Sequence, residues 1–269
     1  MTGDPMPNAF VPGAGNLAPA EAAMVERRQR LLGPAYRLFY ETPVHLVRGE
    51  GVWLYDPEGN AYLDTYNNVA SVGHCHPHVL AATARQSALL ASHTRYLHDT
   101  VLSYAEKLLS HFPPELCHVM FTCTGSEAND IALRMAQAAT GNTGIIATDH
   151  TYHGNTAAVS QLSTTMPPIG GFGGHVRHVP APDSYRGSTA EGFAQAVEAA
   201  CASLVASGHG VSGIILCPAF VNEGFPDLPP GWLDPALAVV RRFGGDIWVQ
   251  VDGGISERTI ERCAAAGAD

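Results

Sequence analysis

The chain has 269 residues, of which 46% are apolar and 15% charged, enough for one large α/β domain, or for one complete unit with part of another. Acidic residues outnumber basic ones by 25 to 15, and the formal net charge of −10 disfavours nucleic acid and anionic membranes as partners. No apolar run approaches the roughly 20 residues of a membrane-spanning helix. The six cysteines are irregularly spaced without a C-x-x-C pair, so we expect reduced thiols. Because we expect no signal peptide, the expected location is the cytoplasm.

The first third of the chain predicts a lead-in, a helix and a hairpin. Residues 1–18 contain neither a basic segment nor an apolar core, so we expect a flexible lead-in and no signal peptide. Residues 19–33 predict a helix with Pro near its start and Gly just past its end. The stretch "VHLVRGEGVWLYDPEGNAYLD" alternates apolar and polar residues around a turn signal at 56–60, which predicts a β-hairpin. Further helices are expected at about 77–93 and 99–112.

In the rest of the chain, short β-rich runs alternate with helical segments. Strands are expected in "CHVMFTC", "GIIAT", "VRHVP", "VSGIILC" and "IWVQVD", and helices at about 126–139, 189–207 and 230–243. This alternation predicts an α/β fold with a mostly parallel sheet and helices on both faces. The N-terminal helix and hairpin would begin a smaller domain beside it.

The stretch "FTCTGSEAND" carries the strongest local signal for chemistry. A predicted buried strand through Cys123 turns at Thr124–Gly125 and enters a helix at Ser126, so free backbone N–H groups converge on one spot with the helix macrodipole behind them. Gly125 lets the backbone approach a ligand, and the Ser126 hydroxyl can cap the helix or bond a phosphate oxygen. On spacing alone, an ordinary capped βα turn is an equal alternative to an anion site.

The loop "GHCHPH" contains four side chains able to bind a metal ion, those of His74, Cys75, His76 and His78. Alternate residues of an extended stretch share one face, but no acidic, Cys or His group elsewhere is spaced to complete a site. We therefore expect a packed, hydrogen-bonded loop and no metal.

Five motifs, in this order, resemble those of the class-III aminotransferases, pyridoxal-phosphate (PLP) enzymes of fold type I: "NNVASVGHCHPHV", "TRYLHD", "FTCTGSEAND", "DHTYHGNTAAVSQLS" and "LPPGWL". The resemblance extends from about residue 44 to residue 243, and it is nearest to the branch containing alanine–glyoxylate aminotransferases and phosphoethanolamine phospho-lyases. It implies the large-domain portion of fold type I, PLP as cofactor, and an amino acid and a 2-oxo acid as substrates. It also implies a homodimer with the cofactor near the subunit interface.

The resemblance implies roles for residues of two motifs. Gly125 and Ser126 match the phosphate-binding turn, in agreement with the anion site inferred above. Tyr152 matches the aromatic residue that stacks on the pyridine ring, because the flat face of the cofactor requires such a platform. A half-buried core aromatic is the alternative interpretation of Tyr152. His153 and Gly154 complete the motif.

Further positions match the family or depart from it. Asn67 and Asn68 match positions on the substrate side, where amides can hold a carboxylate. Asp252 stands about where the family has the Asp that pairs with the pyridine nitrogen. Cys217 replaces the acid of a Glu-Pro pair found in many members, and Glu223 is the nearest carboxylate. The Gly-Phe-x-Arg segment that follows the Asp in the family is missing.

Lysine content limits the expected chemistry. Lys107 is the only lysine in the chain; it precedes the phosphate-binding turn and matches nothing catalytic in the family. The apolar positions of its helix predict that it faces solvent. The resemblance therefore implies that the Schiff-base lysine is absent, and we expect an aminotransferase lineage whose chemistry is incomplete in this chain.

The last 24 residues, "DIWVQVDGGISERTIERCAAAGAD", resemble ribulose-phosphate 3-epimerase, a TIM barrel in which the Asp of the Val-Asp-Gly-Gly motif serves in metal binding and proton transfer. A TIM barrel takes about 250 residues, so an epimerase site cannot be assembled here. We expect a junction near residues 244–246, from a fusion, a frameshift or an assembly error. The predicted segments are a lead-in at 1–18, an N-terminal helix and hairpin at 19–70, a truncated PLP-binding portion at 71–243 and an epimerase-like tail at 244–269.

Three functions follow from these observations. The first is PLP-dependent transamination, which the lineage favours. The second is epimerase activity, suggested by the tail alone. The third is an inactive domain that binds PLP or another phosphate compound, which the missing lysine favours for the chain as given.

Overall fold

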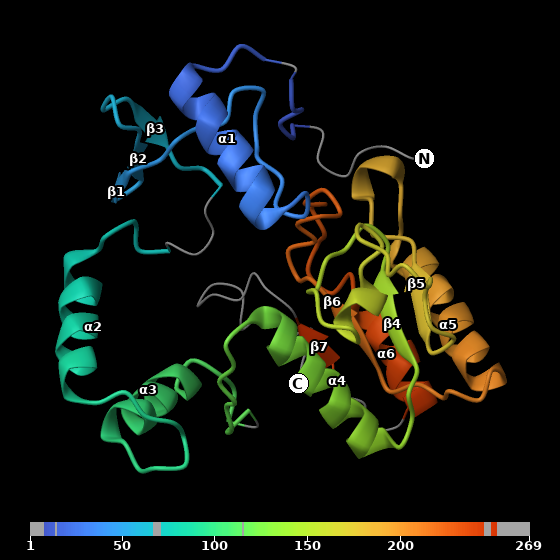
Figure 1. The fold of residues 1–269 in the computed structure, drawn as a ribbon. Helices are drawn as coiled ribbons and strands as arrows, with labels where there is room; N and C mark the ends of the chain where they lie inside the picture. Colours follow the sequence, from blue (N-terminus) through green and yellow to red (C-terminus); the bar gives the residue numbers. More distant parts are fainter. Residues whose placement is uncertain (1–7, 14, 67–70, 115, 245–248, 252–269) are drawn as a thin grey trace. The chain divides into compact units, whose positions relative to one another are not determined.

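A computed structural model of the chain describes residues 8–13, 15–66, 71–114, 116–244 and 249–251. The chain divides into two compact units, an N-terminal unit that ends at Leu97 and a C-terminal unit that begins at His98. Figure 1 shows the elements of both units, coloured along the sequence. The segment boundaries expected after residues 18, 70 and 243 remain predictions.

The N-terminal unit contains two helices and a small antiparallel sheet. The elements are α1 (Pro19–Leu32), β1 (Arg48–Glu50), β2 (Trp53–Tyr55), β3 (Ala61–Leu63) and α2 (Pro77–Leu89). Helix α1 begins at Pro19 and is followed by Gly33 with a φ of 67°, as its Pro and Gly predicted. The strands pair in the order β1-β2-β3, so the predicted hairpin is confirmed and gains a third strand.

A buried carboxylate organises the turn between β2 and β3. Asp56 accepts hydrogen bonds from the backbone N and the Nδ2 of Asn60, both at 2.8 Å, and from the Tyr62 hydroxyl at 2.9 Å. The hydrogen bond from the Asn60 side chain is the main reason that the pKa of Asp56 lies below its usual value. The turn that the sequence predicted at 56–60 is therefore held by polar contacts.

The C-terminal unit is an α/β arrangement around a parallel sheet with the strand order β5-β4-β6-β7 (Figure 1). In chain order its elements are α3 (Asp99–Leu109), α4 (Gly125–Thr140), β4 (Ile145–Thr148), η1 (Val159–Leu162), β5 (Val176–Val179), η2 (Ser184–Arg186), α5 (Ala190–Ala206), β6 (Gly213–Leu216), α6 (Asp234–Gly244) and β7 (Val249–Val251). No helix within the described ranges is long and apolar enough to cross a membrane.

Both faces of this sheet are covered, which gives the unit two apolar clusters. Ile146 and Ile214 belong to the larger cluster, which includes side chains of α5 and α6. Their neighbours Ile145 and Ile215 belong to a second cluster that includes Leu133 of α4. Successive residues of a strand point to opposite faces, so strands buried on both sides are apolar at every position. The predicted parallel sheet with helices on both faces is confirmed.

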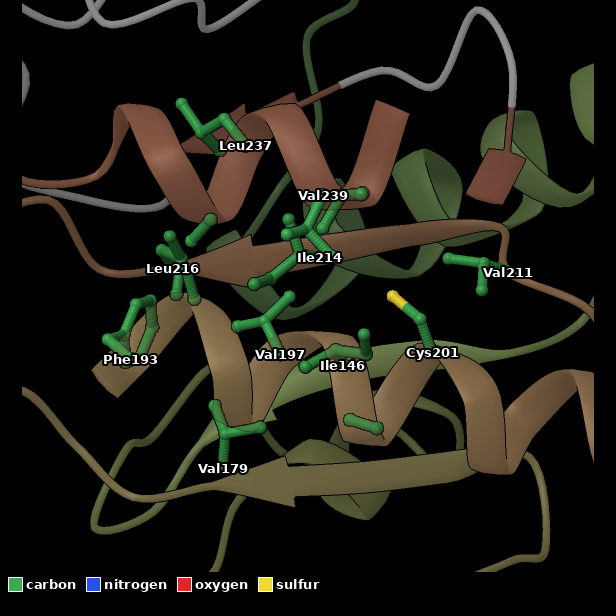
Figure 2. Close-up of a cluster of buried hydrophobic side chains, with 14 of the residues drawn as sticks. Ile146, Val179, Phe193, Val197, Cys201, Val211, Ile214, Leu216, Leu237 and Val239 are labelled. Carbon is green, nitrogen blue, oxygen red and sulfur yellow. The ribbon is translucent and has the colours of Figure 1, made fainter. Parts of the chain in front are cut away.

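Figure 2 shows the larger cluster. Val197 of α5 and Val239 of α6 meet Ile146 and Ile214 of the sheet (Figure 2). Val197 and Cys201 are fully buried, and burial raises the pKa of the Cys201 thiol to about 11. A thiol in this environment stays protonated and packs as a small apolar side chain.

The predicted strand "CHVMFTC" does not form. Residues 116–124 are all described and none of them lies in a strand. Met120 is 63% exposed and Phe121 is 44% exposed, so the segment lacks the burial and the neighbouring strand that an apolar run needs to become a strand. The prediction of a buried strand through Cys123, which is exposed, was therefore wrong. The helix that follows it is nevertheless present.

Candidate cofactor site

The N-terminus of α4 is the first part of the candidate site. Thr124 is the N-cap residue, and its Oγ1 accepts a hydrogen bond from the backbone N of Glu127 at 3.1 Å. The Glu127 carboxylate in turn accepts from the backbone N of Cys123 at 2.8 Å. The N–H groups of Gly125 and Ser126 have no acceptor inside the helix. They lie at the positive end of a 16-residue helix, which is an arrangement that binds anions.

The segment after β4 packs directly against this helix terminus. Ser126 Oγ accepts a hydrogen bond from the backbone N of Asn155 at 3.0 Å. Gly154 has a φ of 140°, and a Cβ atom there would lie 2.5 Å from Ser126 Oγ and 2.8 Å from Ser126 Cα, so only glycine fits. Because Thr124 caps the helix, the Ser126 hydroxyl can still donate its own proton to an anion. The motifs "FTCTGSEAND" and "DHTYHGNTAAVSQLS" are therefore in contact.

The structure places Tyr152 and His153 in different environments. Tyr152 is 38% exposed, so its ring is available to a ligand. His153 is 3% exposed, and its Nε2 lies 3.1 Å from Thr151 Oγ1. The backbone of His153 donates to Ser163 Oγ at 3.1 Å and accepts from Asn129 Nδ2 at 2.8 Å. These contacts hold the segment that carries Tyr152, while contact of His153 with a cofactor remains a prediction.

A carboxylate lies at the carboxyl edge of the sheet. Thr148, the fully buried last residue of β4, donates a hydrogen bond from Oγ1 to Glu223 Oε1 at 2.8 Å. Glu223 Oε2 is buried and has no hydrogen-bond partner in the described part of the chain. The sequence indicated Glu223 only as the carboxylate nearest to Cys217, because no local pattern predicts a contact between residues 75 positions apart.

For the remaining predicted residues, the structure gives no contact with this site among the residues that it describes. Asn67, Asn68 and Asp252 lie outside the described residues. Lys107 is exposed on α3, as its helical pattern predicted. Cys217 is a partly buried free thiol at the end of β6.

In the loop "GHCHPH", the first histidine contacts a carboxylate. The Nε2 of His74 lies 2.6 Å from the Oδ2 of Asp64. Cys75 has a φ of 55°. Among the residues that the structure describes, no group of three or more His, Cys, Asp or Glu side chains could hold a metal ion.

Comparison with known proteins identifies the family. The chain matches the model of the aminotransferase class-III family over residues 38–244. It belongs to the class-III aminotransferases. It is 36% identical over 236 residues to an alanine–glyoxylate aminotransferase 2-like protein of Drosophila melanogaster, a match that covers 82% of this chain and 48% of the relative.

A second relative and a solved structure agree with this assignment. A mitochondrial alanine–glyoxylate aminotransferase 2 homolog 2 of Arabidopsis thaliana is 34% identical over 238 residues, covering 84% of this chain and 49% of the relative. The chain thus spans about half the length of the curated relatives it matches. A phospholyase from Arthrobacter, solved in complex with phosphoethanolamine, is 41% identical with a TM-score of 0.79, covering 85% of this chain and 55% of the other. The expected PLP-transferase fold of type I is confirmed.

PLP is the cofactor of the class-III aminotransferases, and the residues of the candidate site fit it. The backbone N–H groups of Gly125 and Ser126, with the Ser126 hydroxyl, match the oxygens of a phosphate monoester. A Cβ atom at Gly125 would meet nothing within 4 Å, so no distant segment of the described chain packs on this face of Gly125. The exposed ring of Tyr152 supplies a flat surface for the pyridine.

Proposed function

We propose that this chain binds PLP at the N-terminus of α4 and that it descends from enzymes that transfer an amino group from an amino acid to a 2-oxo acid. The observation that carries the proposal is the close approach of Gly154 to Ser126, because it joins the anion-binding turn to the segment that bears Tyr152. Membership of the class-III family supports it.

Each residue has a distinct part in this proposal. Gly125 and Ser126 hold the phosphate, and Tyr152 stacks on the pyridine ring while His153 fixes its segment. The resemblance makes Asp252 a candidate acid for the ring nitrogen. The amides of Asn67 and Asn68 bind the substrate carboxylate. When bound, PLP supplies an electron sink for chemistry at the α-carbon of an amino acid.

Catalysis by this chain alone is not part of the proposal. Transamination requires an amine that attaches the cofactor and then moves a proton at the substrate α-carbon. Lys107 is the only lysine, and it lies exposed on α3, so we infer no turnover by the chain as given. As in the family resemblance, we propose a homodimer with the cofactor near the subunit interface. The cytoplasmic location stays a prediction.

The tail supports a proposal about origin. From its resemblance to ribulose-phosphate 3-epimerase we propose a junction near residues 244–246, ahead of β7. Epimerase activity is the second candidate function. The described parallel sheet is open, with the strand order β5-β4-β6-β7, and this argues against a barrel enzyme. Conversion of ribulose 5-phosphate by the purified chain would establish it and displace our proposal.

The binding site is tested with Gly125→Asp. The side chain has space at this position, and an acid in the first turn is favourable for a helix. Its charge, however, repels a phosphate at the same donors. We expect unchanged or higher stability together with at least tenfold weaker PLP binding by equilibrium dialysis. Gly170→Asp, at an exposed glycine with equally open surroundings, is the control, and equal loss in both variants would contradict the proposed site.

The mode of binding is tested with borohydride. We expect that reduction of the PLP-loaded chain leaves no specific pyridoxyl adduct, and that a panel of amino donors gives no transamination. A specific adduct on Lys107, found by peptide mass mapping and accompanied by turnover, would contradict the inference that the chain is catalytically incomplete.

A further inference from the structure

We propose that Glu223 is a ligand-binding residue whose free carboxylate oxygen accepts a hydrogen bond from a protonated nitrogen of the molecule bound at the α4 terminus. The proposal rests on the proposed PLP site. It assigns a role to a residue that lies outside the motifs matched to the family.

The first support is the state of the carboxylate itself. Oε1 is bound by Thr148 at 2.8 Å, whereas Oε2 is buried and has no partner within the described residues. Glu223 is the only acid among the buried unpartnered atoms found in those residues. A buried acceptor without a donor is costly, so such an oxygen is well suited to a donor that arrives with a ligand.

The second support is position. Thr148 is the last residue of β4, and the chain then runs through Asp149 and His150 to Tyr152, in the segment that packs on Ser126. In sheets of this type, ligands bind beyond the carboxyl ends of the strands. Glu223 therefore stands at the edge where the proposed cofactor lies.

The third support is the backbone that holds Glu223. Phe220 and Phe225 flank it with positive φ angles of 45° and 53°, and the backbone N of Phe225 donates to the carbonyl oxygen of Phe220 at 3.0 Å. Phe220 is 2% exposed and anchors this closed loop in the larger apolar cluster. Positive φ at a bulky residue is unfavourable and is retained where the surrounding structure requires it, often at ligand sites.

The charge of Glu223 determines what it can bind. A carboxylate repels the phosphate that the α4 terminus attracts, so it faces a different part of the same ligand. The matching groups are the protonated ring nitrogen of PLP and the protonated amino group of an amine form of the cofactor, and each would form a charge-assisted hydrogen bond.

Glu223→Gln is the decisive variant. The amide oxygen still accepts from Thr148, but an NH₂ donor can replace the Oε2 acceptor. We expect about tenfold weaker PLP binding by equilibrium dialysis, the factor that corresponds to loss of one charge-assisted hydrogen bond. Asp227→Asn removes the same charge at an exposed position nearby and should bind PLP like the unsubstituted chain.

Three probes distinguish the source of the donor. If the ring nitrogen is the donor, Glu223→Gln weakens PLP binding and leaves binding of 1-deazapyridoxal phosphate, which lacks that nitrogen, unchanged. If the amino group is the donor, pyridoxamine phosphate loses more affinity than PLP. Binding of all three probes within twofold of the unsubstituted chain overturns the inference, as does an equal loss in Asp227→Asn.

Two further outcomes separate this inference from the proposed function. If the unsubstituted chain binds no PLP, the proposed function fails and the inference fails with it. If the unsubstituted chain binds PLP and Glu223→Gln leaves the binding of all three probes unchanged, the inference alone fails. If circular dichroism shows that Glu223→Gln does not fold, Thr148→Val is the alternative variant. It keeps the carboxylate but removes the hydrogen bond that orients it. Unchanged binding of all three probes to this variant would contradict the role of Glu223.

Discussion

The two sheets of this protein are stabilised in different ways. Every residue of β4 and β6 is buried, between helices on both faces of the sheet. In the N-terminal unit, every residue of β3 is exposed, and neither α1 nor α2 contains a buried residue. Apolar burial therefore holds the C-terminal sheet, whereas local polar contacts such as those of Asp56 organise the N-terminal one.

The largest expected effect is a core truncation in the C-terminal sheet. Ile146 is fully buried in the larger cluster, so Ile146→Ala removes apolar contacts and leaves a cavity. We expect a loss of about 3 kcal/mol in the free energy of unfolding, measured by urea denaturation, with reduced hydrogen-exchange protection in β4.

The matched change in the N-terminal sheet is Leu63→Ala. Leu63 is 56% exposed, and we expect a loss below about 0.5 kcal/mol. Similar losses at both positions would show that the two sheets do not differ in the way proposed.

A smaller effect is expected where the two site motifs meet in the C-terminal unit. Gly154→Ala forces a Cβ atom against Ser126, at a φ that L-residues rarely adopt. We expect a loss of about 2 kcal/mol in unfolding free energy, together with weaker PLP binding by equilibrium dialysis. Gly170→Ala, where a Cβ atom meets nothing within 4 Å, is the control and should change neither quantity.

The smallest effect concerns pH, and it separates the two units. Burial holds the pKa of His178 below its usual 6.5, so the folded state binds fewer protons than the unfolded state as pH falls. The stability of the C-terminal unit should therefore be full above about pH 6.5 and decline below it. Hydrogen bonds from Asn60 lower the pKa of Asp56 from 3.8, so its contribution to the N-terminal unit persists above about pH 3.8 and is lost as pH falls further.

Hydrogen exchange measured at a series of pH values can follow the protection of both units in one sample. His178→Gln should reduce the loss of protection in the C-terminal unit below pH 6.5. His118→Gln, at an exposed histidine, should leave that loss unchanged. If protection in both units began to fall at the same pH, the assignment of these two groups would be wrong.

Local patterns were enough to predict most elements of the C-terminal unit. The runs "GIIAT" and "VSGIILC" are apolar and rich in Ile and Val, so they predicted buried strands. The turn at Thr124–Gly125 predicted that a helix begins at Ser126, and α4 begins one residue earlier with Thr124 as its N-cap. Such signals lie within a few neighbouring residues, so they can be recognised without knowledge of the fold.

The segment 117–123 shows where such patterns fail. Its apolar residues resemble those of β4 in type, yet it forms no strand, because a strand also requires a neighbour that pairs with its backbone. The residues of the segment do not indicate whether such a neighbouring strand is present.

The chemical groups of the site can be read from the sequence: the Gly125–Ser126 turn, the aromatic ring of Tyr152, and a single lysine on an exposed helix. Which of these groups lie in contact is known only from the fold. It brought Gly154 against Ser126 and bound Thr148 to Glu223 across 75 positions of chain. Local spacing is enough to predict helix caps and strands. Contacts between distant segments depend on how the whole sheet packs, so the position of Glu223 could be found only in the structure.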